Sequence, residues 1–156
     1  MFERVLILHN IRSALNVGAI FRTAESIGMT RLCLTGYTPL PVDRFGFPDK
    51  QIAKTALGSE LRVPWTHEQD ISLLIARLRS EGCAIIGLEI DPRAIDYKEY
   101  IPKGNVAILL GSEVEGIAPE LRNEVDVLLS IPMRGEKESL NVSVATGILL
   151  YRLFDR

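Results

Sequence analysis

The stretch Val5-Leu-Ile-Leu8, followed by Leu15-Asn-Val-Gly-Ala-Ile-Phe-Arg-Thr-Ala-Glu-Ser-Ile-Gly28, decides which fold the sequence predicts. The first part is a short, continuous apolar run, which is typical of a strand covered on both faces. In the second part the apolar side chains recur at helical spacing and share one face, and Gly28 suits the end of a helix. A buried strand followed by an amphipathic helix predicts the first strand–helix unit of an α/β sheet.

The same alternation continues along the chain. Further strands are predicted at residues 31–35, 61–65, 84–90, 106–110 and 127–131, and further helices at residues 51–57, 66–80, 119–123 and 140–154. Thr66 and Gln69 resemble a capping box at the start of one helix, and Pro119 suits the first position of another. Residues 36–50 hold three Pro and two Gly and form an irregular segment of the kind that often carries function. The pattern predicts the α/β class, with a mainly parallel sheet and helices on both faces.

Length and composition indicate a globular protein. The 156 residues suit one domain, and 47% hydrophobic and 24% charged residues are enough to build an ordinary core. Cys33 and Cys83 lie in apolar runs without CxxC spacing, which favours reduced core cysteines over a disulfide or a metal site. The first apolar run is too short for a signal peptide or a membrane span, so we expect a cytoplasmic protein without a membrane partner. The formal net charge of −2 does not decide about nucleic acid, because phosphate binding depends on local clusters of Lys and Arg.

The predicted final helix, residues 140–154, is apolar on nearly every face. Such a helix has to be covered on all sides, yet this one is too short to cross a membrane. A second copy of the chain is the simplest cover, and a two-fold homodimer is the commonest arrangement. The alternative is a helix wedged inside its own core. We expect the homodimer.

Polar residues without a periodic role gather in three segments at strand ends and helix starts. In residues 10–22, Asn16 suits a helix cap and Arg22 projects from the polar side of the helix. In residues 109–116, Gly111 and Gly116 permit a close backbone approach to a ligand, and Glu113 suits orienting a donor or holding a helix terminus.

The third segment, residues 131–143, leads from a strand into the apolar final helix. Its small polar residues Ser139, Asn141 and Ser143 suit capping, and exposed amides at a helix start can also bind a ligand. In parallel sheets ligands bind beyond the carboxyl ends of the strands, so the loops after Leu88, Leu110 and Ile131 are the expected site. The sequence holds no GxxxxGK[ST], GxGxxG or HExxH motif, which argues against kinase, dehydrogenase and metal chemistry.

Taken in order, the three segments resemble the motifs of the SpoU (TrmH-like) branch of the SPOUT RNA methyltransferases. The matching stretches are residues 16–28, residues 110–116, and Ile131-Pro-Met133 with Ser139-Leu-Asn-Val-Ser-Val-Ala145, and residues 52–58 resemble the family's middle. The resemblance spans nearly the whole chain. It implies that residues 1–156 form a single SpoU-type catalytic domain without extension domains.

The resemblance also implies a fold, a cofactor and a site. It implies an α/β trefoil knot at the C-terminus and a dimer packed through the first and last helices. S-adenosylmethionine is expected in the knot, held largely through backbone groups, by Leu88, Gly111, Ile131, Ser139 and Leu140. The residues that match the family's catalytic centre are Asn16, Arg22, Glu113, Ser139 and Asn141. No metal is expected.

The implied reaction is methyl transfer to a ribose 2′-hydroxyl of RNA, with tRNA as the expected substrate and rRNA as a further possibility. In the family the counterpart of Arg22 is proposed as the base. A guanidinium, with a pKa above about 12, keeps its proton at neutral pH, so we expect Arg22 to bind a phosphate and stabilise the forming alkoxide. Basic residues that flank the expected site and suit phosphate contacts are Arg12, Arg44, Lys50, Lys54, Arg134 and Lys137.

Two alternatives remain from the sequence. One is a base nitrogen rather than a ribose as the methyl acceptor. The other is an RNA-binding or cofactor-sensing dimer that keeps the fold without catalysis.

Overall fold

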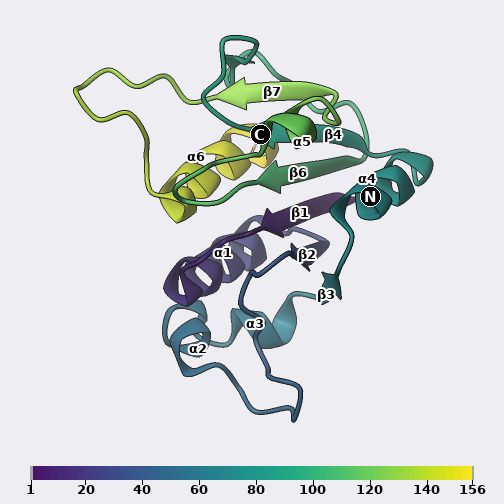
Figure 1. Cartoon of the computed structure of the whole chain (residues 1–156), viewed down its shortest axis with the longest axis vertical. Helices are drawn as coiled ribbons and strands as arrows, with labels where there is room; N and C mark the ends of the chain where they lie inside the picture. The colour runs from purple at the N-terminus through teal and green to yellow at the C-terminus, as the bar shows by residue number, and fades with distance from the viewer. Residues whose placement is uncertain (1, 156) are drawn as a thin grey trace.

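The computed structural model describes residues 2–155, so Met1 and Arg156 of the expected 1–156 domain lie outside the described residues. Its strands are β1 (Arg4–His9), β2 (Arg31–Thr35), β3 (Trp65–Glu68), β4 (Ala84–Leu88), β5 (Ile95–Asp96), β6 (Val106–Leu110) and β7 (Val127–Ser130). They form one sheet in the order β3-β2-β1-β6-β4-β7-β5, and every pair of neighbours is parallel (Figure 1). The predicted α/β class and parallel sheet are confirmed, whereas the trefoil knot stays a prediction.

Helices cover both faces of this sheet, as predicted. They are α1 (Ala14–Ile27), α2 (Lys50–Ala56), α3 (Ser59–Arg62), α4 (Ile71–Ser80), α5 (Pro119–Arg122) and α6 (Val142–Phe154). Leu6 and Leu8 of β1 belong to a core shared with α1, α2 and α6, whereas Val5 and Ile7 belong to a second core shared with α4 and α5. Successive side chains of a strand point to opposite faces, so the apolar run of β1 serves both cores.

The first helix begins one residue earlier than its apolar spacing predicts. The hydroxyl of Ser13 accepts a hydrogen bond from the Asn16 amide at 3.2 Å, so Ser13 is the N-cap and the predicted capping by Asn16 is wrong. At the other end Gly28 has a φ of 76°, and its amide donates to Ala24 and Glu25 carbonyls, which confirms Gly28 as the helix end. With Ser13 as the cap, the side chain of Asn16 is available for other contacts.

Two assignments in the middle of the chain are wrong, and one strand was missed. Residues 61–65 are not a strand: helix α3 ends at Arg62, and β3 begins only at Trp65, where it pairs with β2. Thr66 therefore lies in a strand, and Asp70 caps α4 instead of the expected capping box. The missed strand, β5, has only two residues, too few to give a periodic signal.

The final helix is covered on one side only. Thr146, Leu149 and Leu150 are buried against the chain's own core, whereas Val144 and Ile148 on the other side are exposed. The alternative of a helix wedged inside its own core is therefore wrong for the described residues. No helix between residues 2 and 155 is long and apolar enough to span a membrane.

The corrected start of α4 gives a direct stability test. The Asp70 carboxylate accepts a hydrogen bond from the Leu73 amide at 3.0 Å. Asp70→Ala should therefore lower the free energy of unfolding by about 1 kcal/mol, measured by urea denaturation. Thr66→Ala, the matched control, should have a smaller effect, and the opposite order would restore the capping box.

Candidate functional site

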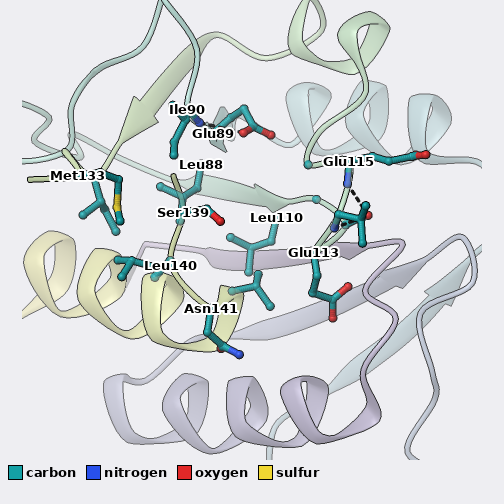
Figure 2. A pocket seen from close by; sticks show the side chains of 17 residues that line it. Leu88, Glu89, Ile90, Leu110, Glu113, Glu115, Met133, Ser139, Leu140 and Asn141 are labelled. Atoms are coloured by element: carbon teal, nitrogen blue, oxygen red, sulfur yellow. Dashed lines mark hydrogen bonds between the residues drawn. The ribbon is translucent and has the colours of Figure 1, made fainter. Parts of the chain in front are cut away.

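A pocket of about 410 Å³ lies where β4, β6 and β7 end and α6 begins (Figure 2). Its wall includes all five residues expected to hold the cofactor, namely Leu88, Gly111, Ile131, Ser139 and Leu140. The sheet brings them together because parallel strands present their carboxyl ends at one edge. Met133 and Ala145 also line the pocket and were not singled out from the sequence.

The loop after β6 forms one wall and folds tightly on itself. The hydroxyl of Ser112 accepts hydrogen bonds from the amides of Val114 and Glu115 at 3.2 and 3.1 Å. A Cβ atom on Gly111 would lie 2.3 Å from the carbonyl carbon of Gly116, so no side chain fits there. A Cβ atom on Gly116 would lie 2.1 Å from a carboxylate oxygen of Glu89. Both glycines line the pocket, and the approach of a ligand to them stays a prediction.

Glu89 holds this loop against β4 and was missed in the sequence. One carboxylate oxygen accepts a hydrogen bond from the Ile117 amide at 2.7 Å, and the other accepts from the Ile90 amide at 2.9 Å. A guanidinium nitrogen of Arg122 lies 3.7 Å from a carboxylate oxygen of Glu89, and the Arg122 Nε donates to the Ile117 carbonyl at 2.7 Å. The position of Glu89, the first ionisable residue after a buried strand that ends at the expected site, is the signal that would have found it.

A chain of hydrogen bonds joins three of the expected catalytic residues. The Asn141 side-chain amide donates to the Asn16 side-chain oxygen at 3.2 Å. The side-chain amide of Asn16 in turn donates to the Glu113 carboxylate at 3.1 Å. In Figure 2 Asn141 lies at the start of α6, and the side chain of Glu113 points toward α1. Asn141 also caps α6, because its side-chain oxygen accepts from the Ser143 amide at 2.9 Å. Segments that are far apart in the sequence thus meet at one edge of the pocket.

Glu113 also holds the start of α1. Its carboxylate accepts hydrogen bonds from the backbone amides of Arg12 and Ser13 at 2.8 and 3.0 Å. Partial burial raises the pKa of Glu113, but these two amides and the Asn16 side chain outweigh it, so the net pKa is lowered. At neutral pH Glu113 is therefore a charged acceptor, as expected of a residue that holds a helix terminus.

Arg22 and Ser139 do not join this hydrogen-bonded chain. Ser139 is exposed on the pocket wall, whereas Arg22 is exposed on α1, outside the pocket. With Leu15 and Ser26, which are also exposed, Arg22 shares a stripe of α1. The stripe adjoins the uncovered side of α6, because the Tyr151 hydroxyl donates to the Ser26 hydroxyl at 3.2 Å.

The pocket wall is acidic and apolar. Glu89, Glu113 and Glu115 contribute to it, and none of the described lining residues is Lys or Arg. The six basic residues expected to contact RNA are all exposed outside it, namely Arg12, Arg44, Lys50, Lys54, Arg134 and Lys137. Arg12, Arg134 and Lys137 belong to segments that flank the pocket, whereas Arg44, Lys50 and Lys54 belong to residues 36–50 and to α2. Acidic side chains thus line the pocket, and the basic side chains lie on the surface around it.

The hydrogen bonds of Glu113 predict a pH-dependent contribution to stability. Because its pKa is lowered on folding, the contribution is present above the ordinary Glu value of about 4.3 and is lost as pH falls through the folded-state value. Glu113→Gln should lower the free energy of unfolding at neutral pH by about 1 kcal/mol, and the difference from wild type should shrink in acid. Urea denaturation across this pH range measures both. Glu115→Gln in the same loop is the control, and an equal loss in the two variants would contradict the bridging role.

Comparison with known proteins places these features in a family. Residues 3–151 match the model of the SpoU rRNA Methylase family. The chain is 34% identical over 147 residues to the 23S rRNA (guanosine-2'-O-)-methyltransferase RlmB of Xanthomonas axonopodis pv. citri, covering 94% of this chain and 56% of that protein. The protein of the same name from Coxiella burnetii is 34% identical over 149 residues, covering 96% and 57%.

A solved structure agrees in fold. The crystal structure of an AdoMet-bound rRNA methyltransferase from Sinorhizobium meliloti matches with a TM-score of 0.85 at 28% identity, covering 96% of this chain and 55% of that chain. This chain spans a little over half the length of these relatives. The family match covers nearly all of it, including the three segments that build the pocket wall, and the chain belongs to the SpoU rRNA methylase family.

Proposed function

We propose that this chain is the catalytic part of an S-adenosylmethionine-dependent RNA methyltransferase that methylates a ribose 2′-hydroxyl. The observation that carries the proposal is the pocket at the carboxyl ends of β4, β6 and β7, whose wall is apolar and acidic. A sulfonium is a cation with apolar substituents, so such a wall complements it. A nucleoside triphosphate would instead require basic residues or a glycine-rich phosphate loop.

The size and make-up of the pocket fit the cofactor. Its volume of about 410 Å³ falls within the range of roughly 300–1,000 Å³ that small-molecule sites occupy. Leu88, Ile131 and Leu140 provide apolar contact, and backbone groups of the loop after β6 provide hydrogen bonds. When bound, S-adenosylmethionine supplies an activated methyl group with its own leaving group, so no metal is required.

Ribosomal RNA is the substrate that we propose. The sequence resemblance led us to expect tRNA, but the relatives named above are 23S rRNA enzymes, and both are more than 30% identical to this chain. The names of these relatives also specify the 2′-oxygen of guanosine, which supports a ribose rather than a base acceptor. We therefore propose rRNA in place of tRNA.

In the proposed reaction, different side chains around the pocket orient the ribose and contact the phosphate. Asn16 and Asn141 are linked to each other and to Glu113, so they offer a fixed set of amide groups at the pocket edge. A ribose held there is oriented for in-line attack, and such positioning can remove several kcal/mol, roughly, from the activation barrier. The Arg22 guanidinium contacts a phosphate and stabilises the negative charge that develops on the 2′-oxygen as the hydroxyl proton passes to solvent.

We propose that Arg22 plays this role at the pocket of a second copy of the chain. It lies outside the pocket of its own chain, on a surface shared with the uncovered apolar side chains Leu15, Val144 and Ile148. Because Leu140 lines the pocket and is itself partly exposed, that surface continues to the pocket edge. We propose that two copies pack through α1 and α6, so that Arg22 of each reaches the pocket of the other.

Cofactor binding is tested by calorimetry. The wild-type protein should release heat with S-adenosylmethionine and with S-adenosylhomocysteine. Ala145→Phe places a ring in the pocket from the buried side of α6 and should weaken binding at least about tenfold, equal to about 1.4 kcal/mol. Leu73→Ala, an exposed change on α4, is the control. An absence of heat with folded wild-type protein would contradict the proposal.

Mixing of inactive subunits tests the role of Arg22 across the interface. Arg22→Ala and Asn141→Ala should each abolish methyl transfer alone. If Arg22 acts on the partner's pocket, a one-to-one mixture should recover about one quarter of wild-type activity, because half of the dimers are mixed and each keeps one intact site. If Arg22 acts within its own chain, every site in the mixture is defective and no activity returns.

A further inference from the structure

Residues 36–50, here named the aromatic hairpin, form an ordered projection. Its base is anchored by the buried Thr38 and by Leu40, which packs on the core, whereas its tip, residues 43–47, is exposed. The Asp43 amide donates to the Phe47 carbonyl at 2.9 Å, and the Asp49 amide donates to the Pro41 carbonyl at 2.9 Å. Val42 and Pro48 face each other in an antiparallel bridge. In Figure 1 this segment extends from the end of β2 beyond α2 and α3 before the chain returns to α2. The sequence indicated an irregular functional segment here, and the proposed chemistry gives it no role.

The aromatic hairpin exposes large rings to solvent. Phe45 is 69% exposed, Phe47 is 68% exposed and Tyr37, at the base, is 57% exposed. Two of the five Phe residues in the chain are thus placed at one tip. Apolar rings gathered in this way on a protein surface usually mark a binding site, because burial of such rings in the core would stabilise the protein more than their exposure to water does.

Cations stand beside these rings, and the nearby carboxylates are occupied by backbone amides. The guanidinium carbon of Arg44 lies 4.7 Å from the centroid of the Phe45 ring. Asp43 accepts hydrogen bonds from the Phe45 and Phe47 amides at 2.8 and 3.0 Å, and Asp49 caps α2. Arg44 and Lys50 are both exposed. The outer surface of the hairpin therefore offers aromatic rings and cations.

A groove of about 580 Å³ runs along the same hairpin. Phe47, Arg44 and Lys50 line it together with Pro39 and Pro48, and the carboxylates of Asp43 and Asp49, which accept from backbone amides, also lie on its wall. Proline fixes the backbone φ angle, so this surface loses little conformational freedom when a ligand binds. The groove is thus a preformed site and not a surface that has to assemble around its ligand.

Hydrogen bonds tie the base of the hairpin to the candidate active site. The Tyr37 amide donates to the Asn10 side chain at 3.1 Å, and the Ile11 amide donates to the Thr38 hydroxyl at 3.1 Å. The next residue, Arg12, donates its amide to Glu113 on the pocket wall. The hairpin and the pocket therefore arise from the same edge of the sheet.

We propose that the aromatic hairpin is a stacking platform for unpaired nucleotides of the RNA substrate that flank the methylated position. Phe45 and Phe47 stack on bases, while Arg44 and Lys50 contact phosphates. Rings interleaved with cations are the usual means of holding single-stranded nucleic acid, since every base has a face that can stack. The inference rests on the proposed function in taking RNA as the substrate, and it names the part of the RNA that this surface recognises.

Binding of short RNAs tests the platform without any methyl transfer. Fluorescence anisotropy would measure the affinity of the whole protein for a labelled single-stranded uridine 12-mer and for an RNA duplex of equal length. The double variant Phe45→Ala/Phe47→Ala should bind the single strand at least about tenfold more weakly and should change duplex binding little. Phe45→Trp should keep the affinity, and its added fluorescence should be quenched when a base stacks on it. Unchanged single-strand affinity in the double variant would overturn the platform.

Controls separate this inference from the proposed function. Leu73→Ala removes an equally exposed apolar side chain from α4 and should leave RNA affinity unchanged. Calorimetry with S-adenosylmethionine should give the same affinity for the double variant and the wild type, because the hairpin does not line the cofactor pocket. A wild-type protein that stacks RNA but binds no cofactor refutes the proposed function alone. A wild-type protein that binds cofactor but no single-stranded RNA refutes the platform and leaves a protein partner as its occupant.

Discussion

The carboxylate of Glu113 is the contact on which the site depends. Glu113 lies in the loop after β6. Its carboxylate accepts hydrogen bonds from the backbone amides of Arg12 and Ser13, just before α1, and from the Asn16 side chain. Asn16 in turn accepts from Asn141 at the start of α6. A lowered pKa keeps the carboxylate charged, so the bridge persists at neutral pH. One anion thus fixes the relative positions of three segments, and the first of them lies about a hundred positions or more before the other two.

The distribution of charge follows from the same arrangement. Inside the pocket, acidic and apolar groups suit a small cationic donor, and the basic side chains lie on the surrounding segments and on the aromatic hairpin. A net charge of −2 is compatible with RNA binding when cations are gathered outside the pocket and carboxylates are tied to backbone amides. The uncovered sides of α1 and α6 add a third surface, which we propose is closed by a second copy of the chain.

Much of this arrangement could be predicted from the sequence, and the exceptions have physical reasons. Continuous apolar runs identified the buried strands β1, β4, β6 and β7, and the five residues expected around the cofactor do share a pocket. Short elements were missed: β5 has two residues and α3 has four, which is too few for an apolar pattern to repeat.

Capping and long-range contacts were the other sources of error. Ser13 caps α1 and Asp70 caps α4, whereas we expected Asn16 and a capping box at Thr66. Sequence patterns locate a helix start only approximately and do not fix its first residue. Glu89 was missed because its role lies in contacts with the Ile117 amide and Arg122, which only the folded chain brings near. The side-chain bridge from Asn16 to Glu113 was likewise invisible in the sequence.

In the proposed reaction the pocket presents a sulfonium methyl group to a ribose of ribosomal RNA. To test this, the protein is incubated with methyl-labelled S-adenosylmethionine and, separately, with unmodified rRNA and tRNA. The products are digested to nucleosides, and the label is located by mass spectrometry. We expect the label on the ribose of one nucleoside from rRNA. Label on a base, or only in tRNA, or in neither RNA from a protein that binds the cofactor, would contradict it.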